Sequence, residues 1–282
     1  MKNFQLIQSH STMKRNILLN PGPATTTDTV KQALMVPDIC PREEEFGELT
    51  QSVLKKIVEV VNGESTHSTV IFAGSGTAGV EAALCSVVPE NGKILILDNG
   101  AYGKRAETII QAYGISHRTI RIEWGDFPDI SQIETVIKEE PKLTHFFFVH
   151  HETTTGMLNP LAEILELCEK YELDSIVDAM SSYAGLPIDL QKQPIDYLIS
   201  SSNKCIQGMA GVSFVIANKE RLKATSNVQP RNLYLNLWGN HSYIEQTGQF
   251  QFTPPVQIVY ALDQALVEFF KETQSGRTAR YV

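Results

Sequence analysis

The sequence predicts an α/β protein with a mostly parallel sheet and helices on both of its faces. Two observations support this fold class. From residue 69 onward, short apolar segments alternate with segments in which apolar residues recur at helical spacing. The chain also has 282 residues, 42% of them hydrophobic, which is enough for one large domain or two smaller ones. Short apolar strands that alternate with helices are typical of a parallel sheet buried on both faces.

Taken in chain order, the pattern assigns each segment to one element. Residues 1–15 form a polar lead-in without periodicity, and Asn20-Pro21-Gly22-Pro23 is a turn cluster that stops any regular element. The predicted strands are 69–72, 93–98, 118–124, 144–150, 175–178, 197–199 and 211–216. The predicted helices are 46–61, 78–88, 104–113, 130–138, 161–171, 233–246 and 256–271.

Charge and composition exclude several classes of protein. Lys and Arg number 24 and Asp and Glu 32, which gives a formal net charge of −8. This balance argues against nucleic acid or an anionic membrane surface as the main partner, although a local pocket can still bind a small anion. No segment approaches the roughly 20 apolar residues of a membrane span, and no apolar leader segment precedes residue 15. We therefore expect a soluble cytoplasmic protein.

The cysteines and histidines give no sign of a metal site or of disulfides. Cys40, Cys85, Cys168 and Cys205 are widely spaced and form no C-x-x-C pair, which favours reduced thiols. His150 and His151 are adjacent, and a strand turns neighbouring side chains to opposite faces. We expect no metal at this position.

In a parallel sheet, ligands bind beyond the carboxyl ends of the strands, so residues that directly follow the strands are the most informative. The first such segment is Ala73-Gly74-Ser75-Gly76-Thr77-Ala78-Gly79, between a strand and a helix. Glycines allow close approach to an anion, and a helix N-terminus offers free N–H groups. This segment is either a phosphate-binding turn, with Ser75 and Thr77 as added donors, or a glycine-rich turn without a ligand.

Two further strand ends bear polar or aromatic groups. Tyr102 follows the Asn99-Gly100 turn, where an aromatic ring can stack on a planar ligand or simply pack on the surface. Three threonines, including Thr154, precede Gly156 and fit either plain turn chemistry or a hydroxyl aimed at a ligand.

Asp178 and Lys204 complete the set. Asp178 ends a buried strand, where its carboxylate needs a partner because an unpaired buried charge is costly. A helix cap or a structural ion pair would serve equally. Lys204 follows Tyr197-Leu198-Ile199 and a run of small polar residues. It is either a surface lysine or one placed to form a Schiff base with an aldehyde cofactor.

Two cofactors compete to explain these residues. Gly74, Gly76 and Gly79 match G-x-G-x-x-G, and Asp98 lies near the offset expected of a nicotinamide dehydrogenase. A dehydrogenase leaves Asp178 and Lys204 without a role. Pyridoxal 5′-phosphate uses all of the features: a phosphate turn, a stacking ring, a hydroxyl, a carboxylate for the pyridine nitrogen and a lysine for the aldehyde.

Five motifs resemble those of the class V (fold type I) aminotransferases, and the similarity covers nearly everything after residue 15. The motifs are Asn20-Pro21-Gly22-Pro23, Asn99-Gly100-Ala101-Tyr102-Gly103, Glu152-Thr153-Thr154-Thr155-Gly156, Val177-Asp178-Ala179-Met180-Ser181-Ser182 and Ser202-Asn203-Lys204-Cys205-Ile206-Gln207-Gly208. The residues 152–160 and 196–208, with Phe252-Thr253-Pro254, resemble members that transfer an amino group from 2-aminoethylphosphonate to pyruvate. The products would be phosphonoacetaldehyde and L-alanine.

The resemblance implies a role for each residue. Lys204 would hold pyridoxal 5′-phosphate as a Schiff base and later move the proton between carbon atoms, and Asp178 would keep the pyridine nitrogen protonated. Tyr102 would stack on the ring, Thr154 would meet the phenolic oxygen, and Asn203 would lie in the same pocket. The remaining cofactor contacts would come from Ser75, Gly76 and Thr77 on the phosphate, and from Thr253 on the phosphate of the neighbouring subunit.

That last contact implies a homodimer. Arg42 is the candidate for the substrate phosphonate, because a guanidinium pairs well with such oxygens, although it could equally be an exposed loop residue.

The resemblance also bears on domain organisation. It implies a cofactor-binding large domain over residues 16–272. Members of the family continue further, so residues 273–282 would begin a smaller C-terminal domain, truncated here, that carries a substrate-binding arginine. Two alternatives therefore stay open beside the aminoethylphosphonate enzyme: another class V aminotransferase, such as the alanine–glyoxylate type, and an inactive relative that retains only the fold.

Overall fold

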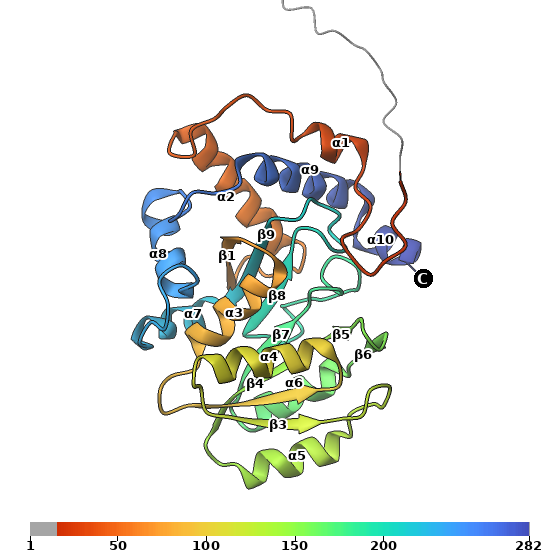
Figure 1. Cartoon of the computed structure of the whole chain (residues 1–282), viewed down its shortest axis with the longest axis vertical. Coiled ribbons are helices and arrows are strands. Elements are labelled where there is room, and N and C mark those ends of the chain that lie inside the picture. Colours follow the sequence, from red (N-terminus) through yellow and green to blue (C-terminus); the bar gives the residue numbers. More distant parts are fainter. Residues whose placement is uncertain (1–15, 282) are drawn as a thin grey trace, which may run out of the picture.

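The computed structural model describes residues 16–281 (Figure 1). Residues 1–15, the predicted lead-in, lie outside the described range, as does residue 282. None of the described helices combines the length and the apolar character needed to cross a membrane.

A seven-stranded sheet forms the centre of the described chain, in the order β1-β9-β8-β7-β4-β2-β3. Strand β9 pairs antiparallel with β1 and β8, and the remaining pairs are parallel. The expected mostly parallel sheet is therefore confirmed. Its strands are β1 (His67–Ala73), β2 (Lys93–Asp98), β3 (His117–Arg121), β4 (Leu143–Val149), β7 (Asp174–Asp178), β8 (Tyr197–Ser201) and β9 (Val212–Asn218).

Helices cover both faces of this sheet (Figure 1). The described helices are α1 (Asp28–Gln32), α2 (Glu44–Glu59), α3 (Gly76–Val87), α4 (Ala101–Ala112), α5 (Ile130–Glu139), α6 (Leu161–Lys170), α7 (Lys219–Ala224), α8 (Leu237–Thr247), α9 (Val256–Glu272) and α10 (Gln274–Tyr281), with a 3₁₀ turn at Thr225–Asn227. A separate two-stranded hairpin joins β5 (His151–Glu152) to β6 (Met157–Leu158).

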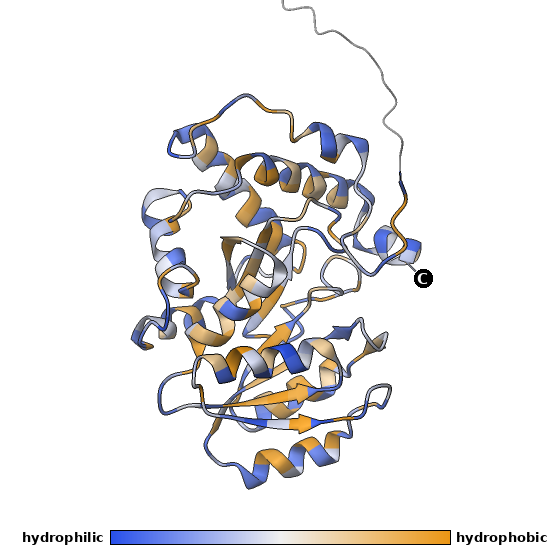
Figure 2. Ribbon diagram, in the orientation of Figure 1, coloured by the Kyte–Doolittle hydropathy of each residue, from blue (hydrophilic) through white to orange (hydrophobic). Residues whose placement is uncertain are grey.

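The core divides into two layers because adjacent strand residues point to opposite faces. Ile94 and Ile96 of β2 belong to the buried cluster that includes residues of α3 and α4, whereas Leu95 and Leu97 belong to the cluster on the other face, which includes residues of α2, α5, α6 and α9. All four are fully buried. Figure 2 shows the strands as largely apolar ribbons and the helices as apolar only along one side. Burial of each such side chain stabilises the fold by roughly 1.5–3 kcal/mol.

Most predicted elements agree with the structure, but the helix predicted at 233–246 begins four residues later, at Leu237. Side-chain hydrogen bonds of two asparagines explain the later start. Asn232 Oδ1 accepts from Leu235 N, and Asn236 Oδ1 caps the helix by accepting from Gly239 N. Asparagine competes with helix geometry in this way and is favoured at the cap.

The topology places the ends of six strands at one edge of the sheet. Strands β1, β2, β3, β4, β7 and β8 run in the same direction, so the segments that follow them begin at this edge. This is the edge at which ligands bind in such sheets.

Candidate active site

A cavity of about 190 Å³ lies at this edge of the sheet. Its walls come from the β1–α3 turn, the first turns of α4, the end of β7 and the loop after β8. The residues that line it are Ser75, Gly76, Thr77, Val80, Tyr102, Arg105, Asp178, Met180, Ser201, Asn203, Lys204, Ala210 and Gly211. Seven residues predicted from the sequence to bind the cofactor are among them: Ser75, Gly76, Thr77, Tyr102, Asp178, Asn203 and Lys204.

Lys204 enters the cavity from a loop that backbone hydrogen bonds hold in place. Gln207 N donates to Lys204 O at 2.8 Å, and Gly208 N donates to Ser202 O at 2.7 Å. The Asn20-Pro21-Gly22-Pro23 segment packs on this loop, because Ala24 N donates to Asn203 O at 2.9 Å. The turn cluster therefore lies beside the lysine and forms part of its surroundings.

Asp178 is 3% exposed and accepts a hydrogen bond from Met180 N at 2.9 Å. Burial raises the pKa of this carboxyl to about 6, the Met180 N–H opposes the rise, and the nearby carboxylate of Glu152 adds to it. Arg105 and Lys204 lower the pKa more weakly. A buried carboxylate with a raised pKa lacks full compensation of its charge, so a cationic ring nitrogen beside it would be stabilised. The surroundings of Asp178 therefore fit a protonated pyridine ring of a cofactor.

The β1–α3 turn presents the N-terminus of α3 to the cavity. Ser75 is the N-cap residue and Gly76 the first residue of the helix, so backbone N–H groups of its first turn face this end. A Cβ on Gly76 would lie 2.6 Å from Met180 Sδ, and one on Gly79 would lie 3.2 Å from Ile199 and Ser213. Gly79 therefore allows α3 to pack closely on the sheet, and Gly76 leaves space for the Met180 side chain.

Arg105 is a cavity residue that sequence reasoning missed. Its guanidinium lies 4.8 Å from the centre of the Tyr102 ring, and its Nη1 donates to Thr77 Oγ1 at 3.4 Å. It therefore joins the predicted stacking residue to the predicted phosphate turn. Its spacing from Tyr102, three residues along a helix, is the signal that could have identified it.

Thr154 lies beside the cavity residues but does not line the cavity. Its hydroxyl donates to Glu152 Oε1 at 2.6 Å and accepts from Ala101 N at 3.1 Å. The structure therefore ties the predicted hydroxyl to the helix that carries Tyr102. Its predicted contact with a phenolic oxygen stays a prediction.

Arg42 and Thr253 lie elsewhere. Arg42 Nη2 donates to Gln251 O at 3.3 Å, Nη1 also bonds Phe250 O, and the residue does not line the cavity. Thr253 is exposed and likewise outside the cavity wall. The contacts predicted for them, with a phosphonate and with a neighbouring subunit's cofactor, remain predictions.

Two histidines of the β4 region are buried, His150 near this edge of the sheet and His145 toward the opposite end of β4. His150 Nδ1 lies 2.9 Å from Ser182 Oγ, and burial lowers its pKa to about 4. Burial lowers the pKa of His145 to about 3. Both rings are therefore neutral at physiological pH. Among residues 16–281, no group of three or more His, Cys, Asp or Glu side chains is arranged to hold a metal ion.

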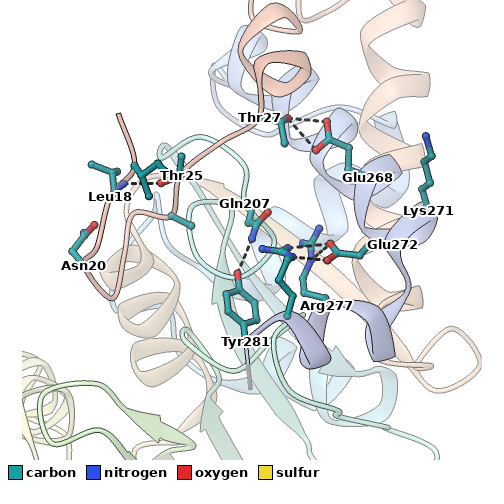
Figure 3. A pocket seen from close by; sticks show the side chains of 13 residues that line it. Leu18, Asn20, Thr25, Thr27, Gln207, Glu268, Lys271, Glu272, Arg277 and Tyr281 are labelled. Carbon is teal, nitrogen blue, oxygen red and sulfur yellow. Dashed lines mark hydrogen bonds and ion pairs between the residues drawn. The ribbon is translucent and has the colours of Figure 1, made fainter. Parts of the chain in front are cut away.

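A larger cavity, of about 770 Å³, lies between the N-terminal segment and α9 and α10 (Figure 3). Its polar side chains pair with one another: Thr27 Oγ1 donates to Glu268 Oε1 at 2.9 Å, and Arg277 Nε donates to Glu272 Oε2 at 2.8 Å. None of the site residues predicted from the sequence lines it. The predicted cofactor-binding residues that line a cavity therefore line the smaller one.

Comparison with known proteins identifies the family. The model of the family "Aminotransferase class-V" matches residues 33–281. The chain belongs to the class V aminotransferases. It is 41% identical over 266 residues to the 2-aminoethylphosphonate–pyruvate transaminase of Pseudomonas fluorescens, covering 94% of this chain and 72% of that protein. The Bacillus cereus enzyme of the same name is 42% identical, with 94% of this chain and 76% of that protein covered.

Solved structures agree with this assignment. The alanine–glyoxylate aminotransferase of Nostoc sp. superposes with a TM-score of 0.88 at 26% identity, covering 99% of this chain and 74% of that chain. A phosphoserine aminotransferase from Cytophaga hutchinsonii has a TM-score of 0.83 at 20% identity, covers 95% of this chain and 74% of that chain, and shares the fold.

Family membership decides between the two cofactors considered from the sequence. Class V aminotransferases depend on pyridoxal phosphate, and this protein is an aminotransferase. The alternative of a nicotinamide dehydrogenase is therefore wrong. Gly76 and Gly79 of its G-x-G-x-x-G match serve close packing instead, and Asp98 is a buried carboxyl at the end of β2.

Proposed function

We propose that this class V aminotransferase transfers the amino group of 2-aminoethylphosphonate to pyruvate, giving phosphonoacetaldehyde and L-alanine. The observation that carries the proposal is the single cavity that Lys204, Asp178, Tyr102 and the β1–α3 turn share. Relatives that bear this enzyme's name, 41% and 42% identical over 94% of the chain, support the choice of substrates.

When bound, pyridoxal 5′-phosphate would supply an aldehyde and an electron-withdrawing ring. Lys204 would provide the amine that holds the aldehyde and would carry a proton at Nζ between carbon atoms of the reacting group. Asp178 would pair with the protonated ring nitrogen. At ~4 Å and an effective dielectric constant of ~20, this pairing amounts to about 4 kcal/mol, or about three pKa units. That suffices to keep a weakly basic pyridine protonated at neutral pH.

The remaining cavity residues would hold the ring and the phosphate. Tyr102 would stack on the ring, and Asn203 would line the pocket beside the lysine. Ser75, Gly76 and Thr77 would bind the phosphate at the N-terminus of α3, where the helix dipole favours an anion. Arg105 would add a positive charge next to Thr77.

We further propose a cytoplasmic homodimer. Thr253 lies exposed and outside the cavity wall, a position from which it could contact the phosphate in a neighbouring subunit. The four cysteines are free thiols, which accords with a reducing compartment. Sedimentation equilibrium of the protein with pyridoxal phosphate should give twice the mass of one chain, and a monomer that turns over substrate would contradict this arrangement.

The activity itself is tested with the purified protein loaded with pyridoxal phosphate. Incubation with 2-aminoethylphosphonate and pyruvate should release L-alanine. An aldehyde should form in the same molar amount as the alanine. Lys204→Ala should abolish both the turnover and the visible absorption band of the bound cofactor. Lys223→Ala, at an exposed position on α7, is the matched control and should leave both unchanged.

A second candidate, alanine–glyoxylate transamination, is favoured by the Nostoc structure, which shares 26% identity. The same preparation should therefore also receive L-alanine with glyoxylate. Formation of glycine with no alanine released from 2-aminoethylphosphonate would overturn the proposed substrate and support the second one. Cofactor binding without turnover of either donor would instead identify an inactive relative.

A further inference from the structure

The carboxylate of Glu152 is buried between two segments of the proposed cofactor site. The residue is 0% exposed and lies at the end of the short strand β5. Its Oε2 accepts from Tyr102 N at 3.1 Å. Its Oε1 accepts from Thr154 N at 3.1 Å and from Thr154 Oγ1 at 2.6 Å. One side chain therefore binds both the helix that carries the proposed stacking ring and the turn that carries the proposed hydroxyl.

A second hydrogen bond closes this connection. Thr154 Oγ1 accepts from Ala101 N at 3.1 Å, so the first two N–H groups of α4 end on Thr154 and on Glu152. These N–H groups have no partner within the helix and need one from outside it. Because the Thr154 hydroxyl gives its only proton to Glu152, the direction of that hydroxyl is fixed by the carboxylate.

Gly100 makes room for this carboxylate. A Cβ on Gly100 would lie 2.3 Å from Cδ of Glu152 and 2.7 Å from Oε2, closer than any real contact. The φ of Gly100 is 176°, an extended value that other residues adopt, so space and not backbone conformation requires the glycine. Gly100 of the Asn99-Gly100 turn is thus the residue that leaves space for the Glu152 carboxylate.

We propose that Glu152 is a positioning residue of this aminotransferase, which holds Tyr102 and Thr154 in register for the cofactor. It acts through these two residues and does not itself line the cavity. The assignment rests on the proposed function, because its meaning depends on pyridoxal phosphate binding between Tyr102 and Asp178. Charge-assisted hydrogen bonds from three donors suit this role, since they are stronger and more directional than neutral ones.

The test compares the Glu152→Gln variant with the wild type. The cofactor-free protein is titrated with pyridoxal phosphate, and the cofactor-loaded protein is studied by circular dichroism. A glutamine has one acceptor oxygen and an NH₂ group, so it cannot accept from both Tyr102 N and Thr154. We expect the dissociation constant for pyridoxal phosphate to rise at least tenfold. The induced circular dichroism of the bound cofactor, which reports the orientation of its ring, should weaken at saturation. Glu166→Gln, which removes an exposed carboxylate from α6, is the control and should match the wild type.

A double-mutant cycle separates positioning from general support of the fold. Thr154→Val removes the hydroxyl that Glu152 orients, so Glu152→Gln should weaken binding much less in that background than in the wild type. Equal effects in the two backgrounds, or a dissociation constant within twofold of the wild type for Glu152→Gln, would overturn the proposal. If Glu152→Gln does not fold, Gly100→Ala displaces the carboxylate from the other side and should weaken binding similarly; unchanged binding would count against the proposal.

The two proposals fail in different ways. A wild-type protein that binds no pyridoxal phosphate would refute the proposed function and leave the Glu152 measurement without a signal. A wild-type protein that binds the cofactor normally, with Glu152→Gln equal to it, would refute the role of Glu152 alone.

Discussion

Gly22 lies directly against the side chain of Lys204. A Cβ built on Gly22 would be 2.5 Å from Lys204 Nζ and 2.6 Å from its Cδ, and Gly22 has a φ of +146°, where L-residues are strained. The turn cluster near the N-terminus of the described chain therefore leaves the lysine its space. A larger residue at position 22 should displace the lysine amine, so it tests whether the position of the amine controls its rate of reaction with an aldehyde.

Gly22→Ala should slow the reaction of Lys204 with pyridoxal phosphate by about tenfold, because the amine must leave its position. The strained backbone should also cost about 1–3 kcal/mol of stability. Stopped-flow absorbance measures the first effect and thermal unfolding the second. Gly114→Ala is the control, since Gly114 also has positive φ but no atom within 4 Å of its Cβ. An equal slowing in both variants would show that backbone strain, and not crowding of the lysine, is responsible.

Arg105→Ala should weaken the binding of pyridoxal phosphate by about tenfold, because it removes a positive charge beside Thr77 and the cation over the Tyr102 ring. Lys104→Ala removes the adjacent exposed charge, which does not line the cavity. Fluorescence titration with pyridoxal phosphate, and separately with pyridoxal, compares the two variants. The loss for Arg105→Ala should be larger with the phosphorylated ligand; equal losses would argue against a phosphate contact.

Asp178→Asn should stabilise the cofactor-free protein at pH 8 by at most about 3 kcal/mol, while it abolishes tight cofactor binding. The sign follows from the pKa of Asp178, which burial raises from 3.8 to about 6. Between these values the folded state holds a proton that the unfolded state has released, so stability falls as pH rises through this range and the cost is complete above about pH 6. The asparagine can still accept from Met180 N and carries no charge.

Urea unfolding of the wild type and of Asp178→Asn at several pH values checks this expectation. The difference in free energy should appear between about pH 4 and pH 6 and should vanish below pH 4, where both unfolded and folded Asp178 are protonated. A difference that is independent of pH would mean that the substitution acts through packing.

The sheet could be predicted because its strands are nearly continuous apolar runs, such as Ile94 to Leu97. A segment this short can bury side chains on both faces only as a strand inside a covered sheet. The direction of β9 carried no comparable signal, since a buried antiparallel strand has the same apolar pattern as a parallel one. Lys204, Asp178 and Tyr102, from three of the five motifs, line one cavity because each lies at or just after the end of a strand, and their contacts with a cofactor stay predictions.

The sequence alone was weaker where function depends on contacts between distant elements. Arg105 is an ordinary exposed helix residue until its distance from Thr77 is known. Glu152 belonged to a recognised motif, but its role depends on the N-terminus of α4, 50 residues earlier in the chain. Short hydrogen bonds between segments far apart in sequence leave no periodic pattern to detect.

Arg277 holds the loop that follows Lys204 in place through hydrogen bonds to its backbone. Its guanidinium is 2% exposed, donates to the carbonyl oxygens of Cys205 and Ile206, and pairs with Glu272. In the proposed function Lys204 Nζ would both hold the cofactor aldehyde and carry a proton, so its side chain would need to move while the loop that bears it stays in place. Because Arg277 of α10 holds the backbone that follows the lysine, we expect such movement to take place in the lysine side chain and not in the loop.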